Sequence, residues 1–319
     1  MKSLKKLFVF SLAAVLLAST GVGAAEAYTI SNTGADSHGD FVLEPGKIEI
    51  FMNPGETVTK NISVISRVSR KVKFAVTVED FIGSQNPDTP VVLLGKDKSP
   101  YSFKDNITPE TSTFNLDLGQ RIEIPVTITA PKSAQPGGFY SSVIISNLPD
   151  DNAVAQNASA RIVSRVGVLL FIRINGPVKE EGTVQDFRVT GPRQGFLQSG
   201  PLTFEILFKN SGSVHLVPYG TVTITNLFGQ KVGEVPVDAY FSLPDSLRYR
   251  QVTWPKEVLF GYYKAHLELH RGYSNVVDSK DLSFFVLPWK YVGLVVLIFF
   301  LIAIIYYVFT RKFELKRKA

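Results

Sequence analysis

A run of nineteen residues near the C-terminus, Tyr291–Phe309, contains neither a charged residue nor a proline. As an α-helix at about 1.5 Å per residue it would cover about 28 Å, close to the hydrocarbon thickness of a bilayer. Trp289, Tyr291, Tyr306 and Tyr307 lie at its two ends, where amphipathic rings favour the membrane–water interface. The run therefore predicts a transmembrane helix at 291–309, in preference to the buried helix of a soluble protein.

A short basic tail, residues 310–319, follows this run and begins with Arg311 and Lys312. Lys and Arg that flank a membrane span stay on the cytoplasmic side of the membrane. The sequence therefore predicts a single-pass type I protein of the cell membrane. The helix would contact membrane lipid, the C-terminus would be cytoplasmic and the preceding chain extracellular.

The N-terminus has the composition of an export signal. Lys2, Lys5 and Lys6 precede an apolar stretch, Leu7–Ala18, which is too short to span a bilayer. The small residues Ala25 and Ala27 then form a cleavage pattern. We expect residues 1–27 to be a signal peptide that is removed before Tyr28, with an uncleaved anchor as the alternative.

The basic residues gather at the two ends of the chain. The formal net charge of +6 divides into +2 from residues 1–27 and +4 from the residues after Thr310, which leaves 28–310 neutral. A neutral exterior argues against nucleic acid as a partner. The chain has no cysteine, so disulfides, thiolate metal sites and cysteine nucleophiles are excluded.

Hydrophobic and polar residues alternate between the two end segments, as half-buried β-strands require. In Gln120–Thr129, for example, every second residue from Ile122 to Ile128 is apolar. The pattern predicts an all-β exterior of two packed-sheet modules. The expected strands are 47–52, 57–66, 71–79, 120–129, 139–147 and 161–174 in the first, and 183–189, 202–209, 219–226, 231–237, 248–254, 262–270 and 282–286 in the second.

The expected modules are a β-sandwich at 41–175 and an immunoglobulin-like β-sandwich at 179–287. A polar segment, 83–113, interrupts the first as a long inserted loop, and such loops are usually functional or disordered. Pro125 suggests that its strand lies at a sheet edge. Residues 161–174 are apolar on both faces, which indicates a strand that is central and buried or that is covered by a partner. Gly138-Phe139-Tyr140 and Gly261-Tyr262-Tyr263 open similar strands, so the modules look like diverged copies, with chance similarity as the alternative.

Five segments together resemble the bacterial WxL-interacting surface proteins: Leu43–Ser66, Ala130–Ser146, Gly200–Val232, Leu243–Pro255 and Gly261–Leu269. The resemblance implies two tandem immunoglobulin-like domains on a C-terminal membrane anchor. It also implies peptidoglycan binding by the first domain and interaction with surface proteins that bear Trp-x-Leu motifs. This chain has no Trp-x-Leu motif of its own. The first module also resembles the immunoglobulin-like domains of pilus chaperones.

Residues that carry chemistry are few. His266, Glu268 and His270 share one face of an expected strand and are spaced for a metal, but a solvated polar face is the preferred interpretation. The turn acids Asp80, Asp150 and Asp151 raise a calcium site as a lesser alternative. No nucleophile elbow, phosphate-binding loop or zinc-protease motif occurs, so we expect no enzyme, catalytic residue, metal or cofactor.

Phe139 and Tyr140 follow a Pro-Gly-Gly turn and are the candidate ligand contacts, because an exposed ring there would stack on a sugar. The preferred interpretation is that both rings pack at a corner of the sandwich. The expected function is a non-enzymatic cell-surface adaptor that binds cell-wall glycan or surface proteins through loops or sheet edges. The alternatives are a chaperone-like subunit binder, which needs the strand 161–174 or an adjacent strand to be unpaired at an edge, and a structural spacer of a membrane complex.

Overall fold

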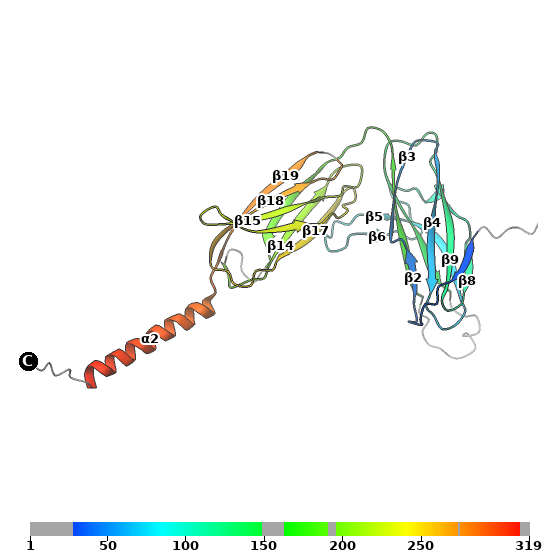
Figure 1. Cartoon of the computed structure of the whole chain (residues 1–319). Helices are drawn as coiled ribbons and strands as arrows, with labels where there is room; N and C mark the ends of the chain where they lie inside the picture. The colour runs from blue at the N-terminus through cyan, green and yellow to red at the C-terminus, as the bar shows by residue number, and fades with distance from the viewer. Residues whose placement is uncertain (1–27, 149–162, 191–195, 274, 313–319) are drawn as a thin grey trace, which may run out of the picture.

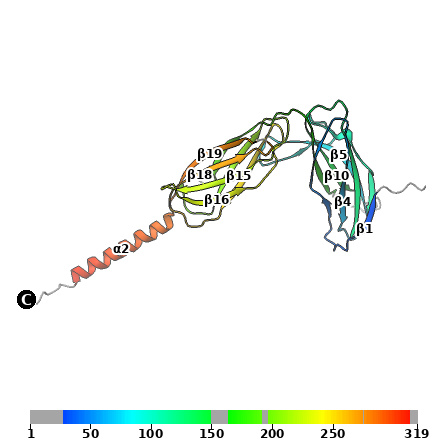
Figure 2. The same ribbon diagram turned by 45° about the horizontal axis from the view of Figure 1, so that its top comes forward.

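A computed structural model describes residues 28–148, 163–190, 196–273 and 275–312. The expected signal peptide, the acids Asp150 and Asp151 and most of the basic tail lie outside these ranges. Figure 1 shows two groups of strands side by side, with one helix leaving the second group. The view in Figure 2 shows the same two groups in contact at one end.

The first group, the N-terminal sheet pair, comprises two mainly antiparallel sheets. One contains β1 (Thr29–Asn32), β9 (Gln120–Thr129), β4 (Thr57–Ser66) and β2 (Phe41–Glu44) in that order, with β7 (Ile107–Pro109) also beside β9. The other contains β3 (Lys47–Met52), β11 (Arg165–Ile174), β10 (Gly137–Asn147), β5 (Val72–Ile82) and β6 (Val92–Leu93), with β8 (Thr113–Leu116) also beside β5. A 3₁₀ turn, η1 (Lys104–Asn106), precedes β7.

The second group, the C-terminal sheet pair, repeats this layered plan. Its smaller sheet contains β12 (Gly182–Val189), β14 (Leu202–Asn210) and β17 (Ser246–Trp254). Its larger sheet contains β13 (Phe196–Leu197), β19 (Val277–Val286), β18 (Gly261–His270), β15 (Tyr219–Asn226) and β16 (Lys231–Val237).

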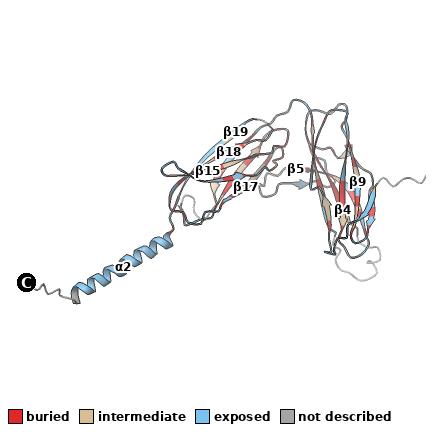
Figure 3. Ribbon diagram, viewed as in Figure 1, coloured by how far each residue is buried: buried red, intermediate tan, exposed pale blue. Residues whose placement is uncertain are grey.

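Each sheet pair closes over its own hydrophobic core, as the alternation predicts. In β9 the side chains of Ile122, Ile124 and Ile128 are buried, and in β18 those of Ala265, Leu267 and Leu269 are buried. The intervening positions face outward, because successive residues of a strand point to opposite faces. Figure 3 shows buried residues inside both pairs and an exposed helix. The all-β class and the sandwich layering are confirmed.

The helix α2 (Trp289–Lys312) begins directly after the last strand. Residues 289–310 are long and apolar enough to cross a membrane. Only Leu287 and Pro288 connect α2 to Val286 at the end of β19. The sequence therefore located this helix correctly, with its start two residues earlier than expected.

Several details differ from the expected strands. The first sheet pair begins before Phe41, because β1 pairs with β9. The edge position expected for Pro125 is wrong, because β9 pairs with β4 on one side and with β1 and β7 on the other. Pro125 is tolerated because β1 and β7 pair with residues 120–123 and 126–128, so its missing N–H falls between them. The expected last strand, 282–286, is the C-terminal half of the longer β19.

The strand apolar on both faces, β11, is interior. It pairs with β10 along its length and with β3 from Leu169 to Ile174. Val168, Leu170 and Ile172 face the core of the N-terminal sheet pair. Leu169 and Phe171 face the opposite way, toward a separate buried cluster that also contains Leu243 from the C-terminal half of the chain. β11 is thus both a central strand of its sheet and a strand covered on its outward face. The second half of the same chain provides the cover.

Candidate functional site at the junction of the two sheet pairs

Four buried side chains, Phe81, Tyr140, Phe171 and Leu243, form a small hydrophobic cluster between the two sheet pairs. The first three come from the outward face of β5, β10 and β11, and Leu243 comes from the segment before β17. The rings of Phe81 and Tyr140 lie 5.6 Å from that of Phe171, and the ring of Phe241 lies 5.0 Å from it on the other side. Offset aromatic contacts at such distances stabilise beyond the area they bury. We call this region the junction.

A hydrogen-bonded triad lies beside this cluster. His215, fully buried between β14 and β15, places its Nε2 atom 2.8 Å from Oε1 of Glu49 on β3. Because a carboxylate only accepts, Nε2–H is the donor. The hydroxyl of Tyr273 donates to the same oxygen of Glu49. The hydrogen bond from His215 and that from Tyr273 lower the pKa of Glu49 from 4.5 to about 2. Burial and the contact with Glu49 raise the pKa of Tyr273.

Tyr140 links the aromatic cluster to the triad. Its hydroxyl oxygen accepts the backbone N–H of His215 at 2.6 Å and lies 3.3 Å from Nδ1 of the same residue. Burial raises the pKa of the Tyr140 hydroxyl. The imidazole of His215 is thereby held from both of its nitrogens, which fixes its orientation.

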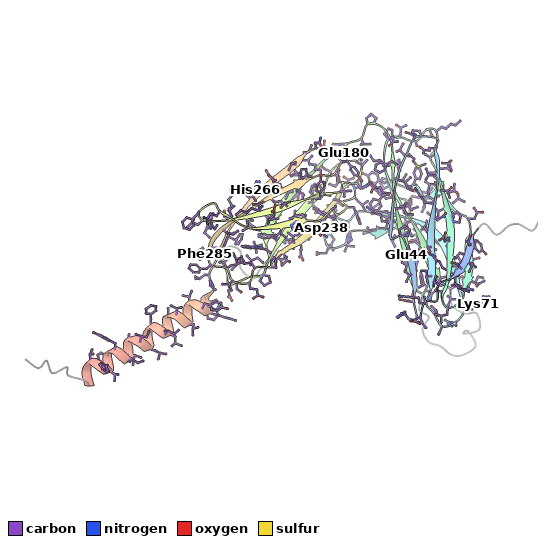
Figure 4. All side chains as sticks on the ribbon, in the orientation of Figure 1. Glu44, Lys71, Glu180, Asp238, His266 and Phe285 are labelled. Atoms are coloured by element: carbon purple, nitrogen blue, oxygen red, sulfur yellow. The ribbon has the colours of Figure 1, made fainter. Side chains whose placement is uncertain are left out.

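An ion pair lies beside the triad. Arg173 of β11 contacts Glu180, in the connection between the sheet pairs, at 2.5 Å. Its guanidinium lies 4.9 Å from the ring centre of Tyr273 and 6.0 Å from that of Phe51. Both charged side chains are mostly buried, and such an ion pair with a stacked ring holds a fixed geometry better than an exposed one. Figure 4 labels Glu180 at the top of the junction.

The inserted loop also joins the two sheet pairs. Its first part, residues 83–101, which we call the strut, meets the edge of β17 at Ser84 and Pro87. Backbone N–H groups of Leu247 and Tyr249 donate to the carbonyls of Ser84 and Pro87 at 3.1 and 3.4 Å. The hydroxyl of Tyr101 donates to Asp245 at 2.9 Å, and burial together with that contact raises its pKa to about 12. The strut thus caps a sheet edge that would otherwise be open.

Gly83, at the base of the strut, approaches the C-terminal sheet pair closely. A Cβ atom there would lie 2.5 Å from Cβ of Ser246 and 2.8 Å from Cβ of Leu243. Only glycine leaves room for this approach. The functional or disordered loop predicted at 83–113 therefore contributes ordered contacts to the junction, and it contains β6, η1 and β7.

The candidate ligand contacts Phe139 and Tyr140 point to opposite faces of β10, as alternation requires. Phe139 packs on the core of the N-terminal sheet pair and lies 5.1 Å from the ring of Phe103. Tyr140 is 1 % exposed and lies inside the junction. Sugar stacking on an exposed ring at this turn is therefore excluded for Tyr140, because the C-terminal sheet pair covers it.

The histidine stripe of β18 has partners of its own. Nδ1 of His266 lies 2.7 Å from Asp281 on β19, and Glu268 lies 3.5 Å from its other nitrogen. His270 stacks on Tyr219 with ring centres 5.0 Å apart. Among the described residues no group of three His, Cys, Asp or Glu side chains is arranged to hold a metal ion. The stripe is a polar face with cross-strand pairs.

Asp80, a calcium candidate, is fully buried and not at a turn. It accepts hydrogen bonds from the Ser141 hydroxyl at 2.7 Å and from the backbone N–H of Ser99 at 3.2 Å. It thereby ties the strut to β10. Trp289, Tyr291, Tyr306 and Tyr307, the residues expected at the two ends of a membrane span, all lie on α2 and are exposed.

Sequence reasoning did not identify Glu49, Arg173, His215 or Tyr273 as a group. The one signal in the sequence was β11, whose outward face carries Leu169, Phe171 and Arg173 next to a charged Glu49 on β3. An apolar outward face indicates a cover, but it does not name the covering segment.

Comparisons with known proteins give similarity only at the level of structure. No family model and no curated protein matches the chain. A chaperone–tip adhesin complex of CFA/I fimbriae superposes with a TM-score of 0.39 at 11 % identity, over 77 % of this chain and 98 % of that one. The class 5 fimbriae chaperone CfaA gives a TM-score of 0.37 at 10 % identity, over 77 % and 99 %. The SafA pilin–SafB chaperone complex of Salmonella enterica gives 0.35 at 12 % identity, over 79 % and 100 %. Sequence identity and superposition are both low, so these likenesses carry no conclusion about function.

Proposed function

We propose that the chain is a non-enzymatic adaptor of the cell surface, anchored by α2 with its two sheet pairs outside the membrane. The observation that carries this is the continuity from the junction to the helix. Contacts among His215, Glu49 and Tyr273 join the sheet pairs, and two residues separate β19 from α2. A chain built in this way has no flexible stalk and holds its outermost sheets at a set position above the bilayer.

The junction supports a fixed angle between the sheet pairs. It combines a buried aromatic cluster, a hydrogen-bonded triad around the buried His215, an ion pair and a backbone-paired strut. Relative motion between domains is the usual expectation unless the interface is large and hydrophobic. Here motion would expose Phe171 and Leu243 to water and leave the carboxylate of Glu49 without its donors, and both changes are unfavourable.

A binding role fits the polar chemistry better than a catalytic one. Perturbed side chains in an enzyme line a cleft where they reach a substrate. Glu49 and Tyr273 are hydrogen-bonded to each other and to His215, so they join the two sheet pairs. Asp80 is satisfied by Ser141 and Ser99. These groups hold the fold together, which supports a role in presenting surfaces to partners.

The nature of the partners rests on the resemblance to WxL-interacting proteins. On that basis the N-terminal sheet pair is proposed to bind peptidoglycan, and the C-terminal sheet pair to bind surface proteins with Trp-x-Leu motifs. The orientation, with the C-terminus inside the cell, rests on the basic residues after Thr310.

The chaperone-like alternative asked for residues 161–174, or a strand beside them, to be unpaired at a sheet edge. β11 is paired by β10 and, over Leu169–Ile174, by β3, and this interior position counts against the alternative. The neighbouring β3 does lie at the edge of its sheet. The free edge that remains on β11, at 165–168, is four residues long. The spacer alternative does not depend on the pairing of this strand. A crosslinking experiment distinguishes a spacer from an adaptor.

The test uses the full chain in the membrane of a bacterial host. A single cysteine replaces exposed Lys60 on β4 or Lys280 on β19, and a photoreactive maleimide that cannot cross membranes is attached in intact cells. Labelling at both positions and crosslinks to peptidoglycan or to one defined surface protein are expected. A chain that labels but forms no crosslink at either position is a spacer. A chain that labels only after the cells are opened refutes the proposed orientation.

A further inference from the structure

Two exposed apolar turns lie at the end of the C-terminal sheet pair from which α2 leaves. Leu227 and Phe228, between β15 and β16, are 68 % and 83 % exposed, and Val258 and Phe260, between β17 and β18, are each 66 % exposed. Such high exposure of four large apolar side chains outside α2 is unusual, because soluble surfaces rarely carry clusters of exposed apolar side chains. We call these four residues the rim.

The strand register places both turns at the same end. Asn226 at the end of β15 is opposite Tyr263 on β18, and Gly261 on β18 is opposite Val286 on β19. The last residue of β15, the first of β18 and the last of β19 are therefore neighbours. Because Trp289 begins α2 two residues after β19 ends, the rim lies beside the start of the helix. Figure 1 shows α2 leaving the end of this sheet pair that is remote from the junction.

The rim is level with the first turns of the helix. Val258 and Phe260 share an apolar groove of about 390 Å³ with Tyr291, Val292 and Val296 of α2. Val296 is seven residues from Trp289, which is about 10 Å along a helix axis. If α2 enters the bilayer at Trp289, the side chains beside Val292 and Val296 reach the same depth. The wall of the groove formed by Val258 and Phe260 therefore lies at the same depth as the wall formed by α2, and both walls contact lipid.

Both turns are held in place by hydrogen bonds. The side-chain oxygen of Asn226 accepts the backbone N–H groups of Phe228 and Gln230 at 3.0 Å each. The hydroxyl of Tyr263 donates to the carbonyl of Phe260 at 3.2 Å, and buried Leu259 fixes the loop between its two exposed neighbours. The apolar side chains of the rim are thus displayed by ordered turns, which lowers the entropic cost of inserting them.

We propose that the rim is a second membrane contact, which inserts Phe228 and Phe260 into the interface of the bilayer and seats the C-terminal sheet pair on its surface. The proposal rests on the proposed anchoring by α2, and commits to a lipid surface as the occupant because the rim continues the membrane-facing surface of α2. Aromatic side chains at the level of the headgroups are favoured there. The contact would fix the tilt of the exterior, which a single helix does not.

The test places an environment-sensitive fluorophore on single cysteines of the full, otherwise cysteine-free chain in phosphatidylcholine–phosphatidylglycerol vesicles that contain nitroxide lipids. The sites are Phe228, Phe260, Val292 as the positive control and Val277 as the matched control. Val277 is exposed on β19 but lies nine residues from Val286, about 30 Å away along the strand.

Labels at Phe228 and Phe260 are expected to be quenched at least twofold more than the label at Val277. A label at Tyr262, with both phenylalanines retained, is expected to lose at least half of its quenching on the double substitution Phe228→Ser and Phe260→Ser. Quenching at Val292 alone would overturn the rim contact and leave the anchor intact. Absence of quenching at all sites, including Val292, would overturn the anchoring and with it the rim contact.

Discussion

Nε2 of His215 lies 2.8 Å from Oε1 of Glu49, although 166 positions separate the two residues in the sequence. Glu49 belongs to the N-terminal sheet pair and His215 to the C-terminal one. The hydroxyl of Tyr273 donates to the same carboxylate. Together these contacts hold the two sheet pairs at one angle. The first three predictions below test it.

Substitution Glu49→Ala is expected to lower the free energy of unfolding of the chain by about 2 kcal/mol. The change removes the acceptor of two hydrogen bonds, one of them from the fully buried imidazole of His215, and hydrogen bonds to charged groups contribute about 1.5–3 kcal/mol each. Urea denaturation in detergent measures the effect. The exposed Glu110→Gln serves as the control and should stay within about 0.5 kcal/mol of the original. Equal effects of the two substitutions would show that the triad does not join the sheet pairs.

Acid should weaken the junction through the same carboxylate. The pKa of Glu49 is about 2 in the folded chain and 4.5 as the reference value. A lowered pKa in the folded state stabilises it fully above the unfolded value, and this contribution declines as pH falls from about 4.5 towards 2. We expect the difference in urea midpoint between the original chain and Glu49→Gln to be constant above pH 5 and to shrink below it. A difference that stays constant down to pH 3 would contradict the lowered pKa.

Tyr140→Phe tests the link between the aromatic cluster and the triad. The substitution keeps the ring but removes the oxygen that accepts the His215 backbone N–H at 2.6 Å. A buried donor without a partner costs about 1–3 kcal/mol, so stability should fall by about that amount. Tyr219→Phe, whose ring is exposed, is the matched control, with an expected change of less than about 0.5 kcal/mol. Thermal unfolding of both variants gives the comparison.

A chain that ends after Leu287 is expected to be soluble and folded. β19 keeps all of its pairing with β18, and Phe284 and Val286 still close the second core. The backbone N–H of Leu287 also retains its bond to Leu197. The shortened chain should fractionate with exported soluble protein and melt cooperatively. Its rim gives at most a weak contact, so retention on membranes after a carbonate wash would contradict the single anchor.

A chain that ends before Asp281 provides the contrast. It loses Phe284 and Val286, which are 3 % and 0 % exposed, and it uncovers the β18 residues that they pair with. Full burial of such side chains contributes about 1.5–3 kcal/mol each, so the loss amounts to several kcal/mol. The shorter chain should be degraded or aggregated, and cooperative melting of it would show that β19 is not part of the second core.

The sequence predicted most of the fold because alternation is a local signal. The bounds of β3, β4, β9, β15 and β16 agree with the expected strands residue for residue. The first half of β19 was missed because Asp278, Lys280 and Asp281 break the apolar pattern, and such charges are typical of an edge strand. β1 and β2 were missed because four residues give too little alternation to recognise.

The junction was beyond sequence reasoning for a different reason. Its members come from β3, β10, β11, the strut and two loops of the second sheet pair. The alternation of β11 indicates that Phe171 points away from the core of the N-terminal sheet pair, but it does not indicate which distant segment covers the ring. The apolar neighbours of His215, Val214 and Leu216, are buried with it, but they do not indicate its partners Glu49 and Tyr140, which are distant in the sequence.

The central claim is that the two sheet pairs are held at one angle, and a distance measurement tests it directly. Spin labels at Lys60 and Lys280, one on each sheet pair, report the distribution of distances between them in the full chain in nanodiscs. A fixed angle predicts one narrow distribution, unchanged by Gly46→Ala, whose Cβ would meet nothing within 4 Å. Gly83→Ala, whose Cβ would collide with Ser246 and Leu243, should broaden or shift it. A broad distribution in the unsubstituted chain would contradict the account.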